Sequence, residues 1–251
     1  MRFVVTGAAS GIGAAVAAAL SQANHKVIAV DRIAPRHDYL EFVPCDLGDE
    51  ASVARACAAI NGDLNGIANV AGVPGTHPGD VVMKVNYLGY RALLEGLLPK
   101  VANGGSVVSV ASTAARHCEW DGARLRSILA LQNWDEVIAA TNAVAEGGTA
   151  TYCNSKRLIT ALTPFLVKAG LPRGIRFNTV SPGITRTPIL QDFRESFGFE
   201  RVEAAASAVG GYGEPDAIAD VIVYLLLPES RWVNGVDIIV DGGLQALREL
   251  T

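Results

Sequence analysis

The feature that most constrains this chain is a glycine-rich stretch close to its start, residues 6–13 (Thr-Gly-Ala-Ala-Ser-Gly-Ile-Gly). The apolar run before it, residues 2–5, is typical of a buried strand, and residues 14–20 are rich in helix-forming alanine and leucine. A strand, a glycine turn and a helix in this order can hold a dinucleotide phosphate at the edge of a parallel sheet. The spacing Gly-x-x-x-Gly-x-Gly also fits an ordinary strand-to-helix turn, so the rest of the chain has to decide between the two.

Composition limits the class of protein. The chain has 251 residues, of which 50% are hydrophobic and 18% charged, which favours one domain, residues 1–251, with a large core. The net charge of −4 and the scattered basic residues argue against nucleic acid as a partner. Cys45, Cys57, Cys118 and Cys153 have neither metal-ligand nor disulfide-framework spacing, so we expect reduced thiols and no metal. No apolar run reaches the ~20 residues of a membrane helix, and we expect a cytoplasmic protein without a membrane partner.

Strand-like and helix-like segments alternate along the chain, which predicts a doubly wound parallel sheet of the Rossmann-like α/β class. About seven strands are expected, at residues 2–5, 26–30, 41–44, 66–69, 105–110, 176–180 and 237–240. Helices are expected at residues 14–20, 51–60, 81–101, 152–168 (interrupted near Pro164) and 214–227.

Two segments depart from this alternation. Residues 116–148 have the apolar spacing of two helices, which predicts a helical insertion that either caps a pocket or forms a partner surface. Residues 184–213 are rich in loop-forming residues and follow a strand end, so they are a candidate substrate lid.

Tyr152 and Lys156 are four positions apart and therefore share one face of the expected helix. A phenol with a pKa near 10 is a poor acid or base at neutral pH. We expect the ammonium of Lys156 to lower that pKa and make the phenol usable in proton transfer. Ser112, just after the strand 105–110, could donate a hydrogen bond to a substrate oxygen. By itself the pair also fits a partly exposed tyrosine beside a solvated lysine.

Asp31 ends the second expected strand, eighteen positions after Gly13. A carboxylate at this point of a dinucleotide fold binds the ribose hydroxyls of the adenosine. It would repel a 2′-phosphate, so Asp31 favours NAD over NADP. Arg32 could bind such a phosphate, although a solvated loop charge is the alternative for it.

Taken together, these motifs resemble the short-chain dehydrogenase/reductase family over nearly the whole chain. The resemblance implies a catalytic tetrad of Asn86, Ser112, Tyr152 and Lys156. It implies that NAD is bound by Gly7, Ser10, Gly11, Ile12, Gly13, Asp31, Arg32, Asp46, Leu47, Asn69, Ala71, Gly72, Lys156, Pro182, Gly183, Ile184 and Thr187. Val70 departs from the family's Asn-Asn-Ala-Gly motif.

Within the family, thirty-nine residues between Ser112 and Tyr152 are more than usual. A similar insertion marks the subgroup of bacterial 3α-hydroxysteroid dehydrogenase/carbonyl reductase, and coniferyl-alcohol dehydrogenase is similar in several short stretches. The resemblance implies hydride transfer between NAD and an apolar, ring-containing alcohol or carbonyl compound, steroid-like or phenylpropanoid. The alternatives are an acyl-thioester ketone reductase and a non-catalytic NAD-binding regulator.

The resemblance also implies an oligomer. Family members form tetramers through two interfaces, and the insertion 116–148 enters the region of one of them. We therefore expect a homodimer built on the helix 214–227 and the last strand, or a tetramer if the insertion only covers the pocket.

Overall fold

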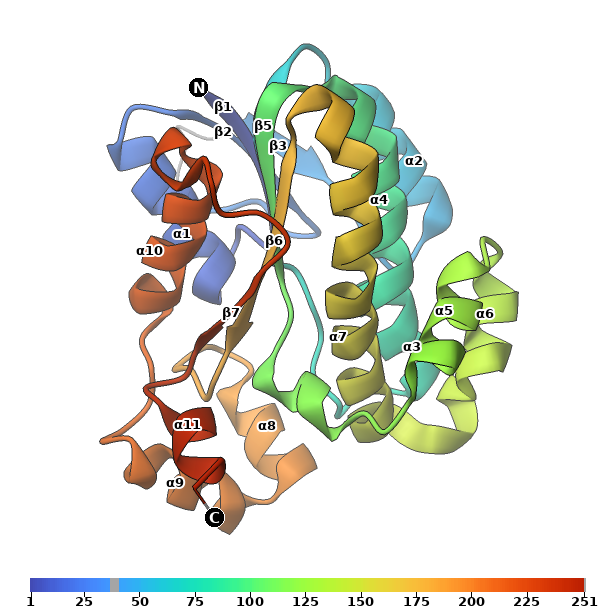
Figure 1. Ribbon diagram of the computed structural model, residues 1–251, viewed down its shortest axis with the longest axis vertical. Coiled ribbons are helices and arrows are strands. Elements are labelled where there is room, and N and C mark those ends of the chain that lie inside the picture. Colours follow the sequence, from blue (N-terminus) through green and yellow to red (C-terminus); the bar gives the residue numbers. More distant parts are fainter. Residues whose placement is uncertain (37–40, 251) are drawn as a thin grey trace.

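The computed structural model describes residues 1–36 and 41–250. Its centre is one sheet of seven parallel strands in the order β3-β2-β1-β4-β5-β6-β7 (Figure 1). The strands are β1 (Arg2–Thr6), β2 (Lys26–Asp31), β3 (Glu41–Pro44), β4 (Leu64–Asn69), β5 (Val101–Val110), β6 (Arg176–Pro182) and β7 (Asp237–Val240). The predicted doubly wound α/β fold is confirmed, and β3 and β7 have the predicted bounds.

Helices cover both faces of the sheet. The longer ones are α1 (Gly11–Gln22), α2 (Glu50–Ala59), α4 (Tyr90–Leu97), α7 (Ala143–Gly170) and α10 (Pro215–Leu226), with α1 and α10 on one face and α2, α4 and α7 on the other (Figure 1). The shorter ones are α3 (Gly79–Met83), α5 (Gly122–Ala130), α6 (Trp134–Thr141), α8 (Leu190–Phe197), α9 (Phe199–Ala208) and α11 (Leu244–Arg248). Single turns of 3₁₀ helix are η2 (Leu98–Lys100), η3 (Thr113–His117), η4 (Leu171–Arg173) and η5 (Pro228–Ser230).

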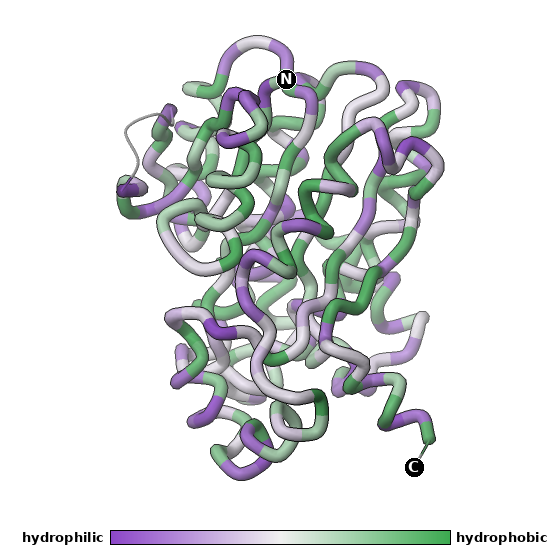
Figure 2. Tube along the Cα trace, turned by 90° about the vertical axis from the view of Figure 1, so that its left-hand side faces the viewer, coloured by the Kyte–Doolittle hydropathy of each residue, from purple (hydrophilic) through white to green (hydrophobic). Residues whose placement is uncertain are grey.

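The strands are apolar on both faces because both faces are covered. In β1, Phe3 and Val5 pack with the α1 and α10 side, whereas Val4 packs with the α4 and α7 side. Figure 2 shows the hydropathy along the chain, with apolar stretches in the interior and many hydrophilic residues in the peripheral turns. All carboxyl ends of the parallel strands consequently meet at one edge of a rigid sheet.

The single helix predicted for residues 81–101 is wrong in detail. The chain there forms α3, then a π-helical segment η1 (Lys84–Gly89), then α4 and η2, and Val101 already belongs to β5. Gly89 lies in this segment against the β3–α2 loop, where a Cβ would collide with the carbonyl oxygen of Leu47. Widened turns of this kind are frequent at functional sites, and this one contains Asn86.

Helix α7 is longer than predicted and is not interrupted at Pro164. The proline lies on the exposed face, where water can bind the carbonyl oxygen that lacks its helical partner. The helical path is broken instead at Gly147, whose φ of 76° and ψ of 172° are non-helical. The regular helix that carries Tyr152 thus starts just after this kink.

The two segments that broke the predicted rhythm are both helical. Residues 116–148 contain α5 and α6, which lie beside the α4 and α7 side of the molecule (Figure 1). The buried guanidinium of Arg91 in α4 donates to the carbonyl oxygens of Leu129 at 3.1 Å and Leu131 at 2.8 Å, which ties the insertion to this side. Residues 184–213 contain α8 and α9, more regular structure than their loop-rich composition predicts.

Within residues 1–36 and 41–250, no helix has both the length and the apolarity needed to cross a membrane.

Candidate functional site

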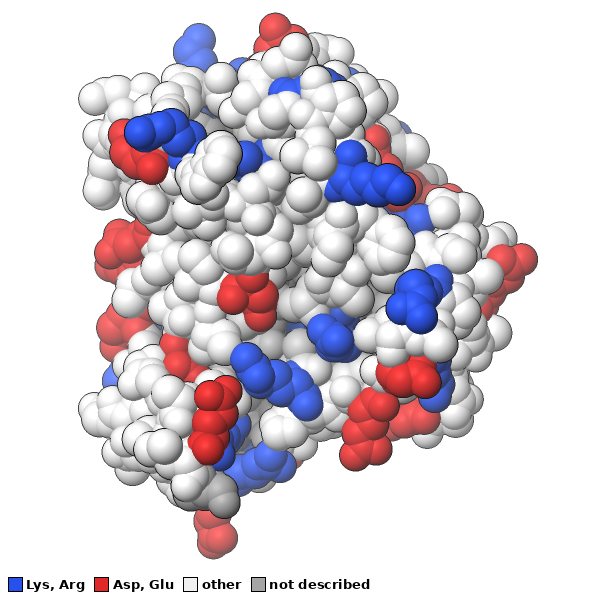
Figure 3. Space-filling model, viewed as in Figure 1, with Lys and Arg blue, Asp and Glu red and all other residues white. Residues whose placement is uncertain are grey.

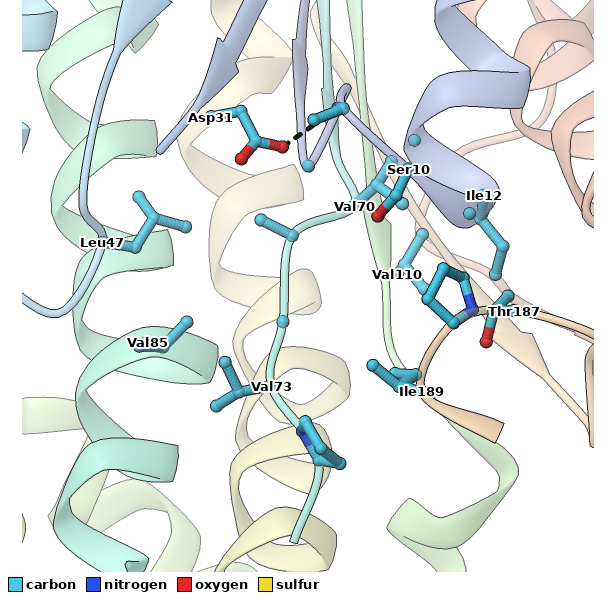
Figure 4. Close-up of a pocket in the computed structure, with 18 of the residues that line it drawn as sticks. Ser10, Ile12, Asp31, Leu47, Val70, Val73, Val85, Val110, Thr187 and Ile189 are labelled. Atoms are coloured by element: carbon cyan, nitrogen blue, oxygen red, sulfur yellow. Dashed lines mark hydrogen bonds between the residues drawn. The ribbon is translucent and has the colours of Figure 1, made fainter. Parts of the chain in front are cut away.

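A cavity of about 580 Å³ lies at the edge of the sheet where the strands end (Figure 4). It brings together most of the residues that the sequence singled out. Those lining it are Gly7, Ser10, Gly11, Ile12, Gly13, Asp31, Arg32, Asp46, Leu47, Ala71, Gly72, Ser112, Tyr152, Lys156, Pro182, Gly183 and Thr187. Asn69, Asn86 and Ile184 do not line it, and their places are described below.

The glycine turn is packed tightly against the end of β4. Gly7 has a φ of +69°, and a Cβ there would come 2.9 Å from the Cα of Ala71. The hydroxyl of Thr6 accepts hydrogen bonds from the backbone N–H groups of Val70 and Ala71, at 2.9 and 3.0 Å. Val70, the departure from the family motif, packs against the apolar cluster on the α1 side. The turn therefore needs glycine for space and leaves its backbone facing the cavity.

The amino end of α1 is open to a ligand. Its N-cap, Ser10, makes no side-chain cap hydrogen bond, and no acidic residue lies in the first turn. The first N–H groups of a helix lack partners within the helix and carry a partial positive charge. An anionic group in the cavity can bind these donors.

Asp31 is held at the end of β2 with both carboxylate oxygens facing donors. Oδ2 accepts from the backbone N–H of Ala9 at 3.0 Å (Figure 4), and Oδ1 accepts from that of Ile33 at 3.2 Å. A carboxylate has about four acceptor sites, so capacity for further donors remains. The neighbouring Arg32 is exposed at the rim of the cavity.

Asp46 and Leu47 lie on the loop after β3. The carboxylate of Asp46 accepts from the backbone N–H of Gly48 at 2.8 Å, which turns the loop. Leu47 points toward the cavity from the side opposite the glycine turn (Figure 4). The pair thus forms one end wall of the cavity, near Asp31.

Tyr152, Ser112 and Lys156 meet near the ends of β5 and α7. The Ser112 side chain lies close enough to the Tyr152 phenol to lower the pKa of that group. The Lys156 ammonium donates to the carbonyl oxygen of Val110 at 2.9 Å and lies 5.9 Å from the centre of the Tyr152 ring. Tyr152 is 5% exposed and Lys156 4% exposed, so both groups are almost fully desolvated.

Burial dominates the proton affinities of this pair. It raises the pKa of Tyr152 to about 12, against the hydrogen bond from Ser112, which lowers it. Burial also lowers the pKa of Lys156 to about 8. The pKa of the phenol is thus raised, whereas we expected Lys156 to lower it. The largest cause is the cost of removing the phenolate from water, and the ammonium over the ring does not offset it.

Asn86 lies behind Lys156, not in the cavity. Its side chain, 1% exposed, accepts from the backbone N–H of Val73 at 2.8 Å and donates to the carbonyl oxygen of Val73 at 3.0 Å. A Cβ on Gly72 would lie 3.2 Å from Asn86 Oδ1 and 3.4 Å from Lys156 Nζ. Asn86 is therefore next to the lysine and at the same time ties the π-helical segment to the chain after β4.

The other two predicted residues outside the cavity have different surroundings. Asn69 is buried at the end of β4, and neither polar atom of its side chain has a hydrogen-bond partner among the described residues. Ile184 lines a separate, smaller cavity of about 230 Å³ beside α9 and α10.

The structure adds lining residues that the sequence did not single out. Phe193 and Phe197 of α8 contact the Tyr152 ring edge-to-face, with centroids 5.3 and 6.3 Å away. His77 and Asp192 also line the cavity, and no spacing in the sequence marks either of them.

Comparison with known proteins identifies two family profiles in the chain. Residues 2–121 match the profile described as short chain dehydrogenase, and residues 132–245 match the one described as Enoyl-(Acyl carrier protein) reductase.

Two curated proteins are similar over almost their whole length. Coniferyl-alcohol dehydrogenase of Pseudomonas sp. (strain HR199) is 34% identical over 97% of this chain and 96% of its own. The 3-alpha-hydroxysteroid dehydrogenase/carbonyl reductase of Comamonas testosteroni is 30% identical over 99% and 98%. Among solved structures, the 3-alpha-hydroxysteroid dehydrogenase from Pseudomonas sp. B-0831, complexed with NADH, superposes with a TM-score of 0.86 at 32% identity, covering 100% of this chain and 99% of that one.

Proposed function

This chain belongs to the short-chain dehydrogenase/reductase family, and we propose that it is an NAD-dependent oxidoreductase of apolar, ring-containing alcohols and the corresponding carbonyl compounds. The observation that carries the proposal is that Ser112, Tyr152 and Lys156 line the same cavity as the open glycine turn, with Lys156 Nζ 5.9 Å from the centre of the Tyr152 ring.

The residues of the cavity fit NAD. The open N–H groups at the start of α1 suit a pyrophosphate. The spare acceptor capacity of Asp31 suits the two ribose hydroxyls of the adenosine, and its charge opposes a 2′-phosphate. Lys156 is the donor for the second ribose, and the remaining contacts are those of the predicted NAD-binding residues that line this cavity. The solved relative complexed with NADH supports this assignment.

The chain's own residues move the proton, and NAD, when bound, supplies the centre that exchanges a hydride with the substrate carbon. In the oxidation of an alcohol, the hydroxyl proton passes to the deprotonated Tyr152 Oη as the C–H hydride leaves, and the phenol is re-formed. In reduction, Tyr152 donates that proton to the carbonyl oxygen, while Ser112 donates a hydrogen bond to the same oxygen. Asn86 keeps the chain after β4 in place beside Lys156 through its two bonds to Val73. The raised pKa of Tyr152, about 12, keeps the phenol protonated, so that it holds the proton that reduction consumes.

The substrate side of the cavity is apolar, which supports a ring-containing substrate. Val73 and Ile189 lie on opposite sides of its lower part (Figure 4), and Phe193 adds an aromatic wall next to Tyr152. Flat apolar surfaces and ring edges suit a ring system. The named activities of the two curated relatives, on coniferyl alcohol and on 3-alpha-hydroxysteroids, are of this kind.

A screen of steroid, terpenoid and phenylpropanoid alcohols tests the proposal, with NADH or NADPH formation followed for each. We expect turnover with at least one class and a kcat/KM for NAD well above that for NADP. A β-keto thioester is included as a competing substrate, and its preferred reduction would favour an acyl-thioester ketone reductase. Tight NADH binding without turnover of any compound would point to a regulator.

We also propose a homodimer. Within the described residues, the insertion 116–148 contributes no residue to the lining of the large cavity. Its helices α5 and α6 pack against α7 instead. That position covers the surface needed for one family interface. Near α10 and β7, in contrast, Trp232 is 97% exposed, and Tyr224 and Val236 are exposed too. Light scattering should give a mass near two chains of 26.2 kDa, and a mass near four chains would contradict the blocking argument.

The cytoplasm is the compartment that we propose. None of the four cysteines is in a disulfide, which suits a reducing compartment. Cell fractionation with an antibody to the protein tests this, and recovery with an oxidising compartment would contradict it.

A further inference from the structure

The outer part of the cavity lies between two segments that are far apart in the chain. One is the loop of residues 73–78, which follows β4, and the other is α8 of the lid. Their apolar lining contains two polar side chains, His77 from the loop and Asp192 from α8.

The loop is a rigid support. Gly75 and Gly148 touch backbone to backbone, since a Cβ on Gly148 would collide with the carbonyl oxygens of Gly75 and His77. A Cβ on Gly79 would collide in the same way with the carbonyl oxygen of Ala143. With no room for side chains, the loop is packed directly on the start of α7 and cannot shift without moving that helix.

One hydrogen bond connects this support to the lid. The hydroxyl of Thr76 donates to Asp192 Oδ1 at 2.7 Å, across 116 positions of sequence. Within the part of the chain that the structure describes, no group donates to the other oxygen, Oδ2. Asp192 is also in the first turn of α8, where the helix dipole favours a negative charge. The carboxylate is thus oriented by Thr76 and keeps an acceptor for a ligand.

The neighbouring cations of the lid are bound elsewhere. Arg194 pairs with Glu203 at 2.8 Å and donates to the hydroxyl of Tyr212 at 3.0 Å. Arg186 pairs with Glu214 at 2.8 Å. Both guanidinium groups thus have carboxylate partners other than Asp192, so this end of the cavity keeps the character of a hydrogen-bond acceptor.

We propose that Asp192, oriented by Thr76 and flanked by His77, accepts a hydrogen bond from a second hydroxyl at the far end of the substrate. The preferred substrates are then ring-containing alcohols or carbonyl compounds with a hydroxyl on the ring system remote from the reacting carbon. Compounds with an anionic group at that place are disfavoured. This inference rests on the proposed function, because it names the substrate class of the same cavity.

Matched substrates test it. The first series differs only at the far end of the ring and consists of cinnamyl alcohol and its 4-hydroxy, 4-methoxy and 4-carboxy derivatives. The second series tests a longer substrate and consists of a steroid 3-alcohol with and without a hydroxyl on the opposite ring. We expect the hydroxyl to raise kcat/KM by about 10- to 100-fold in at least one series, the range of one hydrogen bond to a charged group. The gain should be mainly in KM, since the group is remote from the reacting carbon.

Variants assign the effect to Asp192. In Asp192→Ala, we expect the ratio of kcat/KM between the hydroxylated and unhydroxylated substrates to fall to within about twofold. Glu195→Ala is the matched control, because Glu195 is an exposed carboxylate on the same helix and does not line the cavity. Asp192→Lys provides a gain of function, with the 4-carboxy compound becoming the preferred substrate.

The outcomes separate this inference from the proposed function. If no alcohol is oxidised, the proposed function fails. If alcohols are oxidised but neither series prefers the hydroxyl, or if Asp192→Ala keeps the preference, the inference alone fails. A preference of the wild type for the carboxylate also overturns it. In that case basic groups would select the substrate, such as one of the Lys and Arg side chains that lie among acidic ones on the face shown in Figure 3, or Arg201, 3.4 Å from His117.

Discussion

The cavity has two halves that are built in different ways. One half consists of the sheet edge and α7, where Tyr152 and Lys156 are both at least nine-tenths buried. The other half is the proposed lid, residues 184–213, where Asp192 and Phe193 are half-buried. The first half is held by backbone ladders and core packing, whereas the second is joined to the rest of the chain by exposed polar pairs such as Arg186 with Glu214.

The difference between the two halves corresponds to two different requirements of catalysis, proton transfer and substrate entry. Proton transfer needs groups at fixed positions out of water, where their electrostatic interactions are strong. Substrate entry needs a segment that can open, and exposed ion pairs contribute only about 0–1 kcal/mol each, so a lid held by them opens at low cost. The comparison predicts large effects from changes in the buried half and smaller ones from changes in the lid.

The largest effect is expected for Tyr152→Phe, which keeps the ring and removes the transferable proton. We expect kcat to fall by roughly 10²–10⁴-fold, with NADH affinity largely unchanged. Steady-state kinetics and a fluorescence titration of NADH measure the two quantities. Tyr224→Phe, at an exposed tyrosine on α10, is the control. A Tyr152→Phe protein with most of its kcat would show that the buried half does not carry the chemistry.

Next comes Lys156→Met, measured as the free energy of unfolding of the cofactor-free protein in urea. The folded pKa of Lys156, about 8, is below its ordinary value of 10.5, so the unfolded chain binds more protons between these pH values. Wild-type stability should therefore rise with pH in this window. The shift corresponds to roughly 3 kcal/mol of free energy. At pH 7, Lys156→Met should be more stable than the wild type by this amount, minus the contribution of the lost hydrogen bond to Val110.

The advantage of Lys156→Met should shrink as the pH rises from 8 to 10.5. Lys168→Met removes an exposed lysine from the same helix and serves as the control. A difference between Lys156→Met and wild type that stays constant over this range would mean that the ammonium is not desolvated as the structure indicates.

Asp31→Ser should change the choice of cofactor. Losing the carboxylate removes acceptors for the ribose hydroxyls and the repulsion of a 2′-phosphate, while Arg32 stays at the rim. We expect the ratio of kcat/KM for NAD to that for NADP to fall about 10- to 100-fold, the range of one or two charged hydrogen bonds. Wild-type kinetics with no preference for NAD would contradict the role given to Asp31 and direct attention to Arg32.

The smallest effect is expected for Arg194→Ala, which breaks the contacts of α8 with Glu203 and Tyr212. We expect KM to rise a few-fold, kcat to stay within about twofold, and limited proteolysis within residues 190–213 to become faster. Arg55→Ala, which breaks an exposed pair with Asp49 on α2, is the control. A loss of kcat as large as that of Tyr152→Phe would erase the distinction between the two halves.

The sequence by itself determined the features that depend on local pattern. The apolar runs predict all seven strands because parallel strands are buried on both faces. Residues 6–13 predict the turn because only glycine fits the close approach of Gly7 to Ala71. Tyr152 and Lys156 share a helix face because of their spacing, whatever the rest of the chain does.

The tertiary structure alone decided what depends on segments distant in sequence. The π-helical turn around Asn86 is tied by hydrogen bonds between the Asn86 side chain and the backbone of Val73. Helix α7 continues past Pro164 because the proline lies on the exposed face of the helix. The pKa of Tyr152 rises because several elements together exclude water from the phenol. The bond between Thr76 and Asp192 spans 116 positions. Desolvation and long-range contacts depend on residues that are distant in sequence and meet only in the folded chain, so no local pattern of residues predicts them.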